Sequence, residues 1–434
     1  MGLELPQIGD LRLATKAAPA LLHRFGGFAV SLVFSTLVNL LAIPFVIFTL
    51  GKGIWGELAL AQATAALFGI LVAYGWGTVG AAMVASLPVY ERPQMYLDSL
   101  VSRSYLFLFA APVMFLAVLA ISRVDPIVAA VAAVAYLLPF LGASWYFVGQ
   151  AKPWQLLVFD VLPQGLGVVT GVVLMMFMPH AYTFVGSLLF FNLVAVILGA
   201  TGALRSRPSQ PLKRNLALVP AMRRLRDQRH GVIAAGTGSL NSNLPLLVVN
   251  QVVQAALPQY AMADKLFRFA VAGFGPVLQV IQGWIPEAGV SASRNRIRVV
   301  ARLAPAAGLL AGVVLAALTP WASSAFSGGS INIGLELSAP FGVILAGVIV
   351  AQIVGLACLI PLGKGAALAK STAIGAALNV PLMILLGFAF GAPGVAWAVG
   401  LAELVVASYQ LLVVGTTLRH LARAEPASAS EPRK

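Results

Sequence analysis

Long apolar runs alternate with short polar connections along the whole chain. A helix needs about 20 apolar residues to cross a bilayer, and the runs reach or exceed this length. The pattern therefore predicts an all-α membrane protein with about 12 transmembrane helices in two six-helix bundles. The expected helices span residues 25–50, 57–86, 99–122, 126–149, 153–178, 181–204, 231–256, 258–290, 299–321, 337–361, 365–390 and 393–418.

The distribution of Lys and Arg sets the expected orientation. With a cytoplasmic N-terminus, the outside connections hold only Lys52 and Arg123, and Lys265 and Arg268 lie inside the eighth helix. The other 24 of the 28 basic residues (28 − 4 = 24) then fall on the cytoplasmic side. This bias follows the positive-inside rule, and it predicts that both termini are cytoplasmic.

The most basic connection divides the chain into two halves. We expect a cytoplasmic lead-in over 1–24, a first lobe over 25–204, a basic linker over 205–230, a second lobe over 231–418 and a cytoplasmic tail over 419–434. The basic linker is typical of a topology determinant beside anionic lipid; a specific lipid or partner site is the other interpretation.

The two halves show a weak internal repeat. A shift of 202 residues places Asn39 on Asn241 and Gln62 on Asp264. Parallel repeats of this kind are common in transporters, whose two bundles flank a central site. If the repeat holds, the first lobe presents a neutral version of the charged face in the second.

Composition places the chain in the membrane. It is 60% hydrophobic and 10% charged, with a mean hydropathy of +0.92, whereas soluble proteins carry about 25% charged residues. The net charge of +14 reflects the cytoplasmic loops, so we expect no nucleic-acid partner. The lone Cys358 excludes a disulfide within the chain, and the four histidines lack metal-ligand spacing. No catalytic motif stands out, which favours a transporter over an enzyme.

The eighth helix carries three charges within five residues: Asp264, Lys265 and Arg268. Each costs roughly 2.5–3.5 kcal/mol near the middle of a membrane helix, so this face must look into protein or water. Two interpretations remain. Asp264 and Arg268 have the i, i+4 spacing of a structural ion pair, which would leave Lys265 unpaired. Alternatively, Lys265 or Arg268 lines a water-accessible path, on a polar stripe that continues to Gln279.

Other polar residues recur at helical spacing in the apolar runs. Asn39 lies in the first helix, and Asn243, Asn250 and Gln254 share one face of the seventh. Such amides either contact a ligand or hydrogen-bond between helices. Two intramembrane carboxylates, Asp160 and Glu403, are functional candidates by default. Either binds H⁺ or Na⁺ as a coupling site or pairs with a basic residue.

Prolines fall inside several expected helices, where bent or broken backbone is tolerated if protein or cavity water satisfies it. They mildly favour a flexing transporter. They are Pro44, Pro112, Pro139, Pro163, Pro245, Pro276 and Pro381.

Several short segments together resemble a known family. The segments are LALAQ at 58–62, YGWG at 74–77, WYFVGQ at 145–150, YAMADKL at 260–266, Asn379, GAPGVAWA at 391–398 and Glu403. The chain resembles the polysaccharide-transporter branch of the MOP superfamily, the Wzx-type O-antigen flippases. Lipid II flippases of the same superfamily usually carry two further helices.

The resemblance implies a function. Such proteins flip an undecaprenyl-pyrophosphate-linked oligosaccharide across the bacterial cytoplasmic membrane by alternating access between two lobes. The YAMADKL match implies that Lys265, followed by Arg268, contacts the pyrophosphate or acidic sugars. The implied partners are the lipid-linked oligosaccharide, membrane lipids and other polysaccharide-assembly proteins. No cofactor is expected beyond a coupling H⁺ or Na⁺. The alternative is a MATE-like antiporter of drugs or metabolites.

Overall fold

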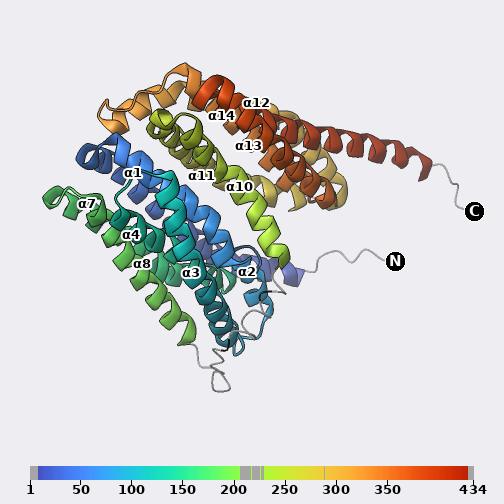
Figure 1. Ribbon diagram of the computed structural model, residues 1–434. Coiled ribbons are helices and arrows are strands. Elements are labelled where there is room, and N and C mark those ends of the chain that lie inside the picture. The colour runs from blue at the N-terminus through green and yellow to red at the C-terminus, as the bar shows by residue number, and fades with distance from the viewer. Residues whose placement is uncertain (1–7, 206–216, 218–224, 226–228, 288, 429–434) are drawn as a thin grey trace, which may run out of the picture. The chain divides into compact units, whose positions relative to one another are not determined.

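The computed structural model describes residues 8–205, 217, 225, 229–287 and 289–428 (Figure 1). Within these ranges the regular secondary structure is entirely helical, which confirms the predicted all-α class. Nearly all of the predicted basic linker lies outside the described residues. So do the first residues of the predicted lead-in and the last residues of the predicted tail.

In the described part of the chain, nine helical segments are long and apolar enough to cross a membrane. Two of them, Gly26–Ser86 and Gly365–Leu421, are 61 and 57 residues long, and each covers two of the expected spans. The predicted total of twelve and the predicted orientation stay predictions. Multiple spans of this length make the chain a multi-pass membrane protein.

Each of the two double-length segments bends at a glycine. Gly51 has φ 83° in α1, and Gly391 has φ 66° in α14. A positive φ is strained for residues with a Cβ and unstrained for glycine. The bends fall between the expected spans 25–50 and 57–86, and between 365–390 and 393–418. The sequence pattern therefore located these two boundaries.

The chain forms two compact units, Met1–Leu240 (unit 1) and Asn241–Lys434 (unit 2), divided inside α10. In unit 1, α4 packs against both α3 and α8 (Figure 1). Helix α2 packs against α5. The elements before the division are α1 (Ile8–Ala73), α2 (Trp76–Ser86), α3 (Arg92–Ile121), α4 (Pro126–Leu137), η1 (Leu138–Leu141), α5 (Ser144–Gly149), α6 (Pro153–Leu156), η2 (Leu157–Val161), α7 (Leu162–Phe177) and α8 (Ala181–Leu204).

Two spans of unit 1 are interrupted where the sequence predicted continuous helices. The expected helix 126–149 narrows to a 3₁₀ turn at η1 and breaks at Gly142 before α5. Pro139 lies in this turn, and its missing N–H disfavours regular helix. The expected helix 153–178 contains a π-helical turn, η2, which carries Asp160 and ends two residues before Pro163. Both interruptions contain or adjoin prolines that the sequence marks as bend sites.

Unit 2 packs its long helices around one apolar core. Leu278 of α11, Ile349 of α13 and Ala407 of α14 belong to this core. Its helices pack mainly as α12 against α13 and α13 against α14. The elements are the end of α10 (Arg229–Val252), η3 (Gln254–Ala256), α11 (Leu257–Glu287), α12 (Gly289–Ser327), α13 (Leu335–Gln352), η4 (Ile353–Leu359) and α14 (Gly365–Ser428).

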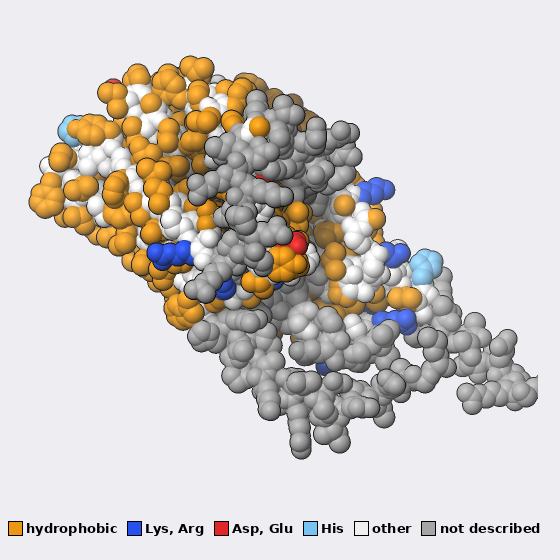
Figure 2. Space-filling model, turned by 90° about the horizontal axis from the view of Figure 1, so that it is seen from below, with side chains coloured by type: hydrophobic (Ala, Val, Ile, Leu, Met, Phe, Trp, Pro, Cys, Tyr) orange, Lys and Arg blue, Asp and Glu red, His pale blue; other side chains and the backbone are white. Residues whose placement is uncertain are grey.

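Large apolar side chains cover much of the exposed surface. Figure 2 shows hydrophobic side chains spread over the visible face, with few Lys, Arg, Asp or Glu among them. Phe48 is 92% exposed, and Phe177 and Phe388 are also highly exposed. A soluble monomer rarely exposes apolar patches of this extent, so this surface is suited to lipid.

Candidate functional site

Helix α11 carries three charges and packs its apolar residues into the core of unit 2. Leu278 is buried in the core of unit 2, and Leu266 and Phe267 pack against that core. This agrees with the predicted polar stripe along one side of the helix, although apolar Val277 is half exposed. Because the apolar side is fixed in the core, the rotation of α11 and the direction of its charged side are also fixed.

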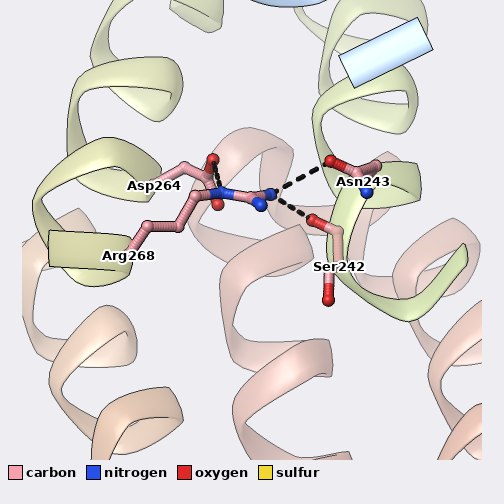
Figure 3. Close-up of polar contacts among 4 residues, drawn as sticks. All are labelled: Ser242, Asn243, Asp264 and Arg268. Atoms are coloured by element: carbon pink, nitrogen blue, oxygen red, sulfur yellow. Dashed lines mark hydrogen bonds and ion pairs between the residues drawn. The ribbon is translucent and has the colours of Figure 1, made fainter. Parts of the chain in front are cut away.

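Arg268 is held by three acceptors (Figure 3). Its Nε donates to Asp264 Oδ2 at 2.7 Å. Its Nη2 donates to the Ser242 carbonyl at 2.6 Å and to Asn243 Oδ1 at 3.2 Å. None of the described residues accepts a hydrogen bond from Nη1. The guanidinium is therefore oriented by α10 and α11, and one nitrogen stays available to a ligand.

The ion pair is accessible rather than buried. The Arg268 side chain is 43% exposed and that of Asp264 is 20% exposed. The predicted i, i+4 pair is thus confirmed, but the expectation that it would leave Lys265 unpaired is wrong. Lys265 interacts electrostatically with both Asp264 and Arg268. Two cations and one carboxylate leave this group with a net charge of +1.

Glu403 belongs to a second polar network in unit 2. Asn241 Nδ2 donates to Glu403 Oε1 at 3.1 Å, and Asn379 Nδ2 donates to Asn241 Oδ1. Asn241 of α10 therefore links Glu403 and Asn379, which both belong to α14. Carboxylate and amide oxygens can bind a proton or a hard cation such as Na⁺.

Asp160 lies in unit 1 and is 6% exposed. Gln164 hydrogen-bonds its carboxylate. Among the described residues, neither Asp160 nor Glu403 forms an ion pair with Lys or Arg. For each carboxylate, both predicted roles, ion coupling and pairing with a basic residue, remain hypotheses.

The remaining candidate residues are dispersed. Asn250 is buried on α10, and Gln279 is exposed on α11. Asn39 is exposed in α1 and donates to the Ser35 carbonyl at 2.9 Å. The placement of Gln254 on the helical face of Asn243 is wrong, because α10 ends at Val252 and Gln254 begins the 3₁₀ turn η3.

Three further polar residues that the structure places in networks or buries were not among the predicted site residues. Asn241 appeared only as the repeat partner of Asn39, and Asn379 only as part of the family resemblance. Arg103 lies near the start of the expected helix 99–122 and counts among the basic residues of the cytoplasmic side, and the structure buries it to 1% exposure inside unit 1. For Asn379 the resemblance was a usable signal. No local sequence signal distinguishes Arg103 from the loop arginines.

Comparison with known proteins identifies the fold. No family model matches the chain, and no curated protein matches it. Solved structures do. The lipid II flippase MurJ in an inward closed conformation has a TM-score of 0.68 at 12% identity, covering 89% of this chain and 87% of its own.

Two MATE transporters are also similar. An inward-facing multidrug resistance transporter of the MOP superfamily has a TM-score of 0.64 at 15% identity, with coverage of 90% and 96%. The Vibrio cholerae transporter VcmN, in its bent form, has a TM-score of 0.54 at 12% identity, with coverage of 93% and 98%. At these identities the similarity establishes a shared fold, so this chain has the fold of MOP-superfamily transporters.

Proposed function

We propose that this protein is a flippase that moves an undecaprenyl-pyrophosphate-linked oligosaccharide across the cytoplasmic membrane by alternating access. The oligosaccharide is a repeat unit of O-antigen, capsule or exopolysaccharide. The observation that carries the proposal is Arg268, a fixed and accessible cation in an apolar helix bundle. A pyrophosphate that leaves water needs charge-assisted hydrogen bonds to offset its lost hydration.

The charge of the α11 group favours an anionic substrate. Asp264 orients Arg268 and cancels one positive charge, and Lys265 restores the excess. A partly neutralised group attracts a phosphate without holding it too tightly for release. The name of the MurJ structure, a flippase of lipid II, supports a lipid-linked substrate for this fold.

The network around Glu403 is the proposed coupling site. Its carboxylate binds H⁺ or Na⁺, with the amides of Asn241 and Asn379 supplying further polar contacts. Energy from the ion gradient would then drive the transport cycle.

Surface-polysaccharide complementation tests the proposal. Lys265→Ala and Arg268→Ala are expressed in a strain that lacks its own flippase, with membrane insertion checked by immunoblot. Lys370→Ala serves as a matched control, because it removes one cation from a different helix of unit 2. We expect export to fall in the two α11 variants and to persist in the control. Full export by both α11 variants would contradict the assignment.

The alternative function is MATE-like antiport of drugs or metabolites, favoured by the similarity to two MATE structures. A cation exporter is expected to present net negative charge to its substrate, whereas the α11 group is net positive. Drug-resistance assays on the same strains separate the two functions. Resistance that depends on Glu403, together with normal polysaccharide, would favour the antiporter.

A further inference from the structure

Unit 1 contains a buried arginine that the proposed transport site does not use. Arg103 of α3 is 1% exposed. Its Nη1 donates to the carbonyls of Phe140 at 3.0 Å and Gly142 at 3.1 Å. These carbonyls lie where α4 gives way to the 3₁₀ turn and the break before α5, so Arg103 satisfies acceptors that regular helix would otherwise satisfy.

The other edge of the Arg103 guanidinium is unsatisfied. Its Nε and Nη2 have no hydrogen-bond partner in the described part of the chain. These two nitrogens form the side edge that binds carboxylates and other anions through two parallel hydrogen bonds. No described Asp or Glu forms an ion pair with Arg103. The edge of the buried Arg103 guanidinium that is suited to an anion is therefore left without a described partner inside unit 1.

Further unsatisfied polar groups belong to the cluster of side chains that packs with Arg103. The centroid of the Trp145 ring lies 5.5 Å from Arg103 Cζ. The same ring packs against the rings of Trp76 and Tyr96, with centroid separations of 5.1 and 6.1 Å. Each of these three rings has a buried polar atom without a described partner, as does Ser99, one helical turn before Arg103. Among the described residues, six of the thirteen such atoms belong to these five residues, so the deficit is concentrated here.

The chemistry of these groups selects the ligand. Indole Nε1 and guanidinium nitrogens only donate, whereas the two hydroxyls donate or accept. The missing partner must therefore accept several hydrogen bonds. Water accepts hydrogen bonds but brings no negative charge to a buried guanidinium that forms no ion pair with a described Asp or Glu, and an unpaired buried charge is costly in a low-dielectric interior. An anion meets both requirements, and the near-complete burial of all five residues limits it to a small one.

We propose that unit 1 binds a halide ion, chloride under ordinary conditions, at the side edge of Arg103. The ion joins α3, which carries Tyr96, Ser99 and Arg103, to Trp76 of α2 and Trp145 of α5. It stabilises the break between α4 and α5 and is distinct from the proposed substrate.

Asp160 is a buried carboxylate near the proposed halide site. It lies near Tyr96 and interacts electrostatically with it, and its Oδ1 lies 3.0 Å from the position that a Cβ on Gly142 would take. Removal of its negative charge eliminates repulsion toward a halide. Asp160→Asn is therefore expected to tighten halide binding.

Thermal unfolding of the detergent-purified full chain tests the site. The Tm is measured at constant ionic strength while sodium chloride or bromide replaces sodium gluconate. A ligand that binds only the folded state raises the Tm saturably, and we expect this for both halides. Trp145→Phe and Ser99→Ala each remove one donor while keeping Arg103, and should raise the half-saturating chloride concentration about tenfold. Arg103→Gln should abolish the response.

Matched controls are Arg123→Gln and Trp321→Phe, which remove an arginine and an exposed indole elsewhere. A crystal grown in bromide should show an anomalous peak within hydrogen-bond distance of Arg103 Nε. The proposal is overturned if the wild-type Tm is equal in chloride and gluconate, or if the bromide peak lies elsewhere. If Arg103→Gln fails to fold, an unchanged chloride response in both Trp145→Phe and Ser99→Ala overturns it.

Discussion

Asn241 and Ser242 are neighbours on α10, yet they take part in different polar networks. Asn241 contacts Glu403 and Asn379, whereas the Ser242 carbonyl accepts from Arg268. The proposed coupling carboxylate and the proposed headgroup cation are therefore connected through consecutive residues of one helix. A shift of α10 that alters one set of contacts must alter the other.

This connection predicts energetic coupling between the two networks. Glu403→Gln and Asn243→Ala should each slow transport, and the double variant should be several-fold more active than the product of the single effects predicts. Contacting or linked residues give such non-additivity. Transport is measured in reconstituted vesicles. Glu336→Gln combined with Asn243→Ala is the control pair, and its effects should multiply; equal behaviour of both pairs would remove the link through α10.

The two intramembrane carboxylates should differ in their response to neutral substitution. Glu403→Gln should abolish the dependence of transport on the H⁺ or Na⁺ gradient, because Glu403 is linked to Arg268 through α10. Asp160→Asn should retain that dependence, since Asp160 contacts Gln164 within unit 1. Transport rates with and without ionophores for each ion provide the measurement. Loss of gradient dependence in Asp160→Asn alone would assign coupling to unit 1 instead.

The ion pair on α11 should contribute little to stability. Exposed i, i+4 pairs contribute about 0.3–0.5 kcal/mol, and Arg268 is 43% exposed. A double-mutant cycle with Asp264→Asn and Arg268→Gln, followed by thermal unfolding in detergent, should give a coupling free energy below about 1 kcal/mol. A value above about 2 kcal/mol would instead support a purely structural pair, and the functional assignment of Arg268 would lose its main argument.

The sequence predicted those features that depend on local pattern. Apolar run length located the helices, and helical periodicity predicted both the apolar side of α11 and the pairing of Asp264 with Arg268. Periodicity also placed Gln254 on the polar face of α10, beyond the end of that helix at Val252. Periodicity does not indicate where a helix ends. Helix end signals such as Gly and Pro place the bends at Gly51 and Gly391 but not the end of α10 at Val252.

Contacts between distant residues could not be read from the chain. Arg103 looks like any cytoplasmic arginine in the sequence, and its hydrogen bond to the Gly142 carbonyl spans 39 positions. The link from Asn241 to Glu403 spans 162 positions. Such proximities are set by how helices pack, and a single sequence contains no direct record of packing.

The crossing of α12 and α13 provides a test of packing in unit 2. A Cβ on Gly312 would lie 2.4 Å from the Gly342 carbonyl oxygen, and one on Gly342 would lie 2.5 Å from the Gly312 carbonyl oxygen. Small residues allow membrane helices to approach this closely, and no other residue fits at either position without moving the backbone. Gly312→Ala should therefore destabilise the protein by about 1–3 kcal/mol, the usual range for overpacking.

Gly415→Ala is the matched control for this substitution. A Cβ on Gly415 would meet nothing within 4 Å, and alanine favours helix over glycine by about 1 kcal/mol. The control variant should therefore be as stable as the wild type or more stable, while Gly312→Ala unfolds at a lower temperature. Thermal unfolding of both variants in the same detergent gives the comparison. Equal Tm values for the two variants would contradict the close approach of α12 and α13 at Gly312 and Gly342.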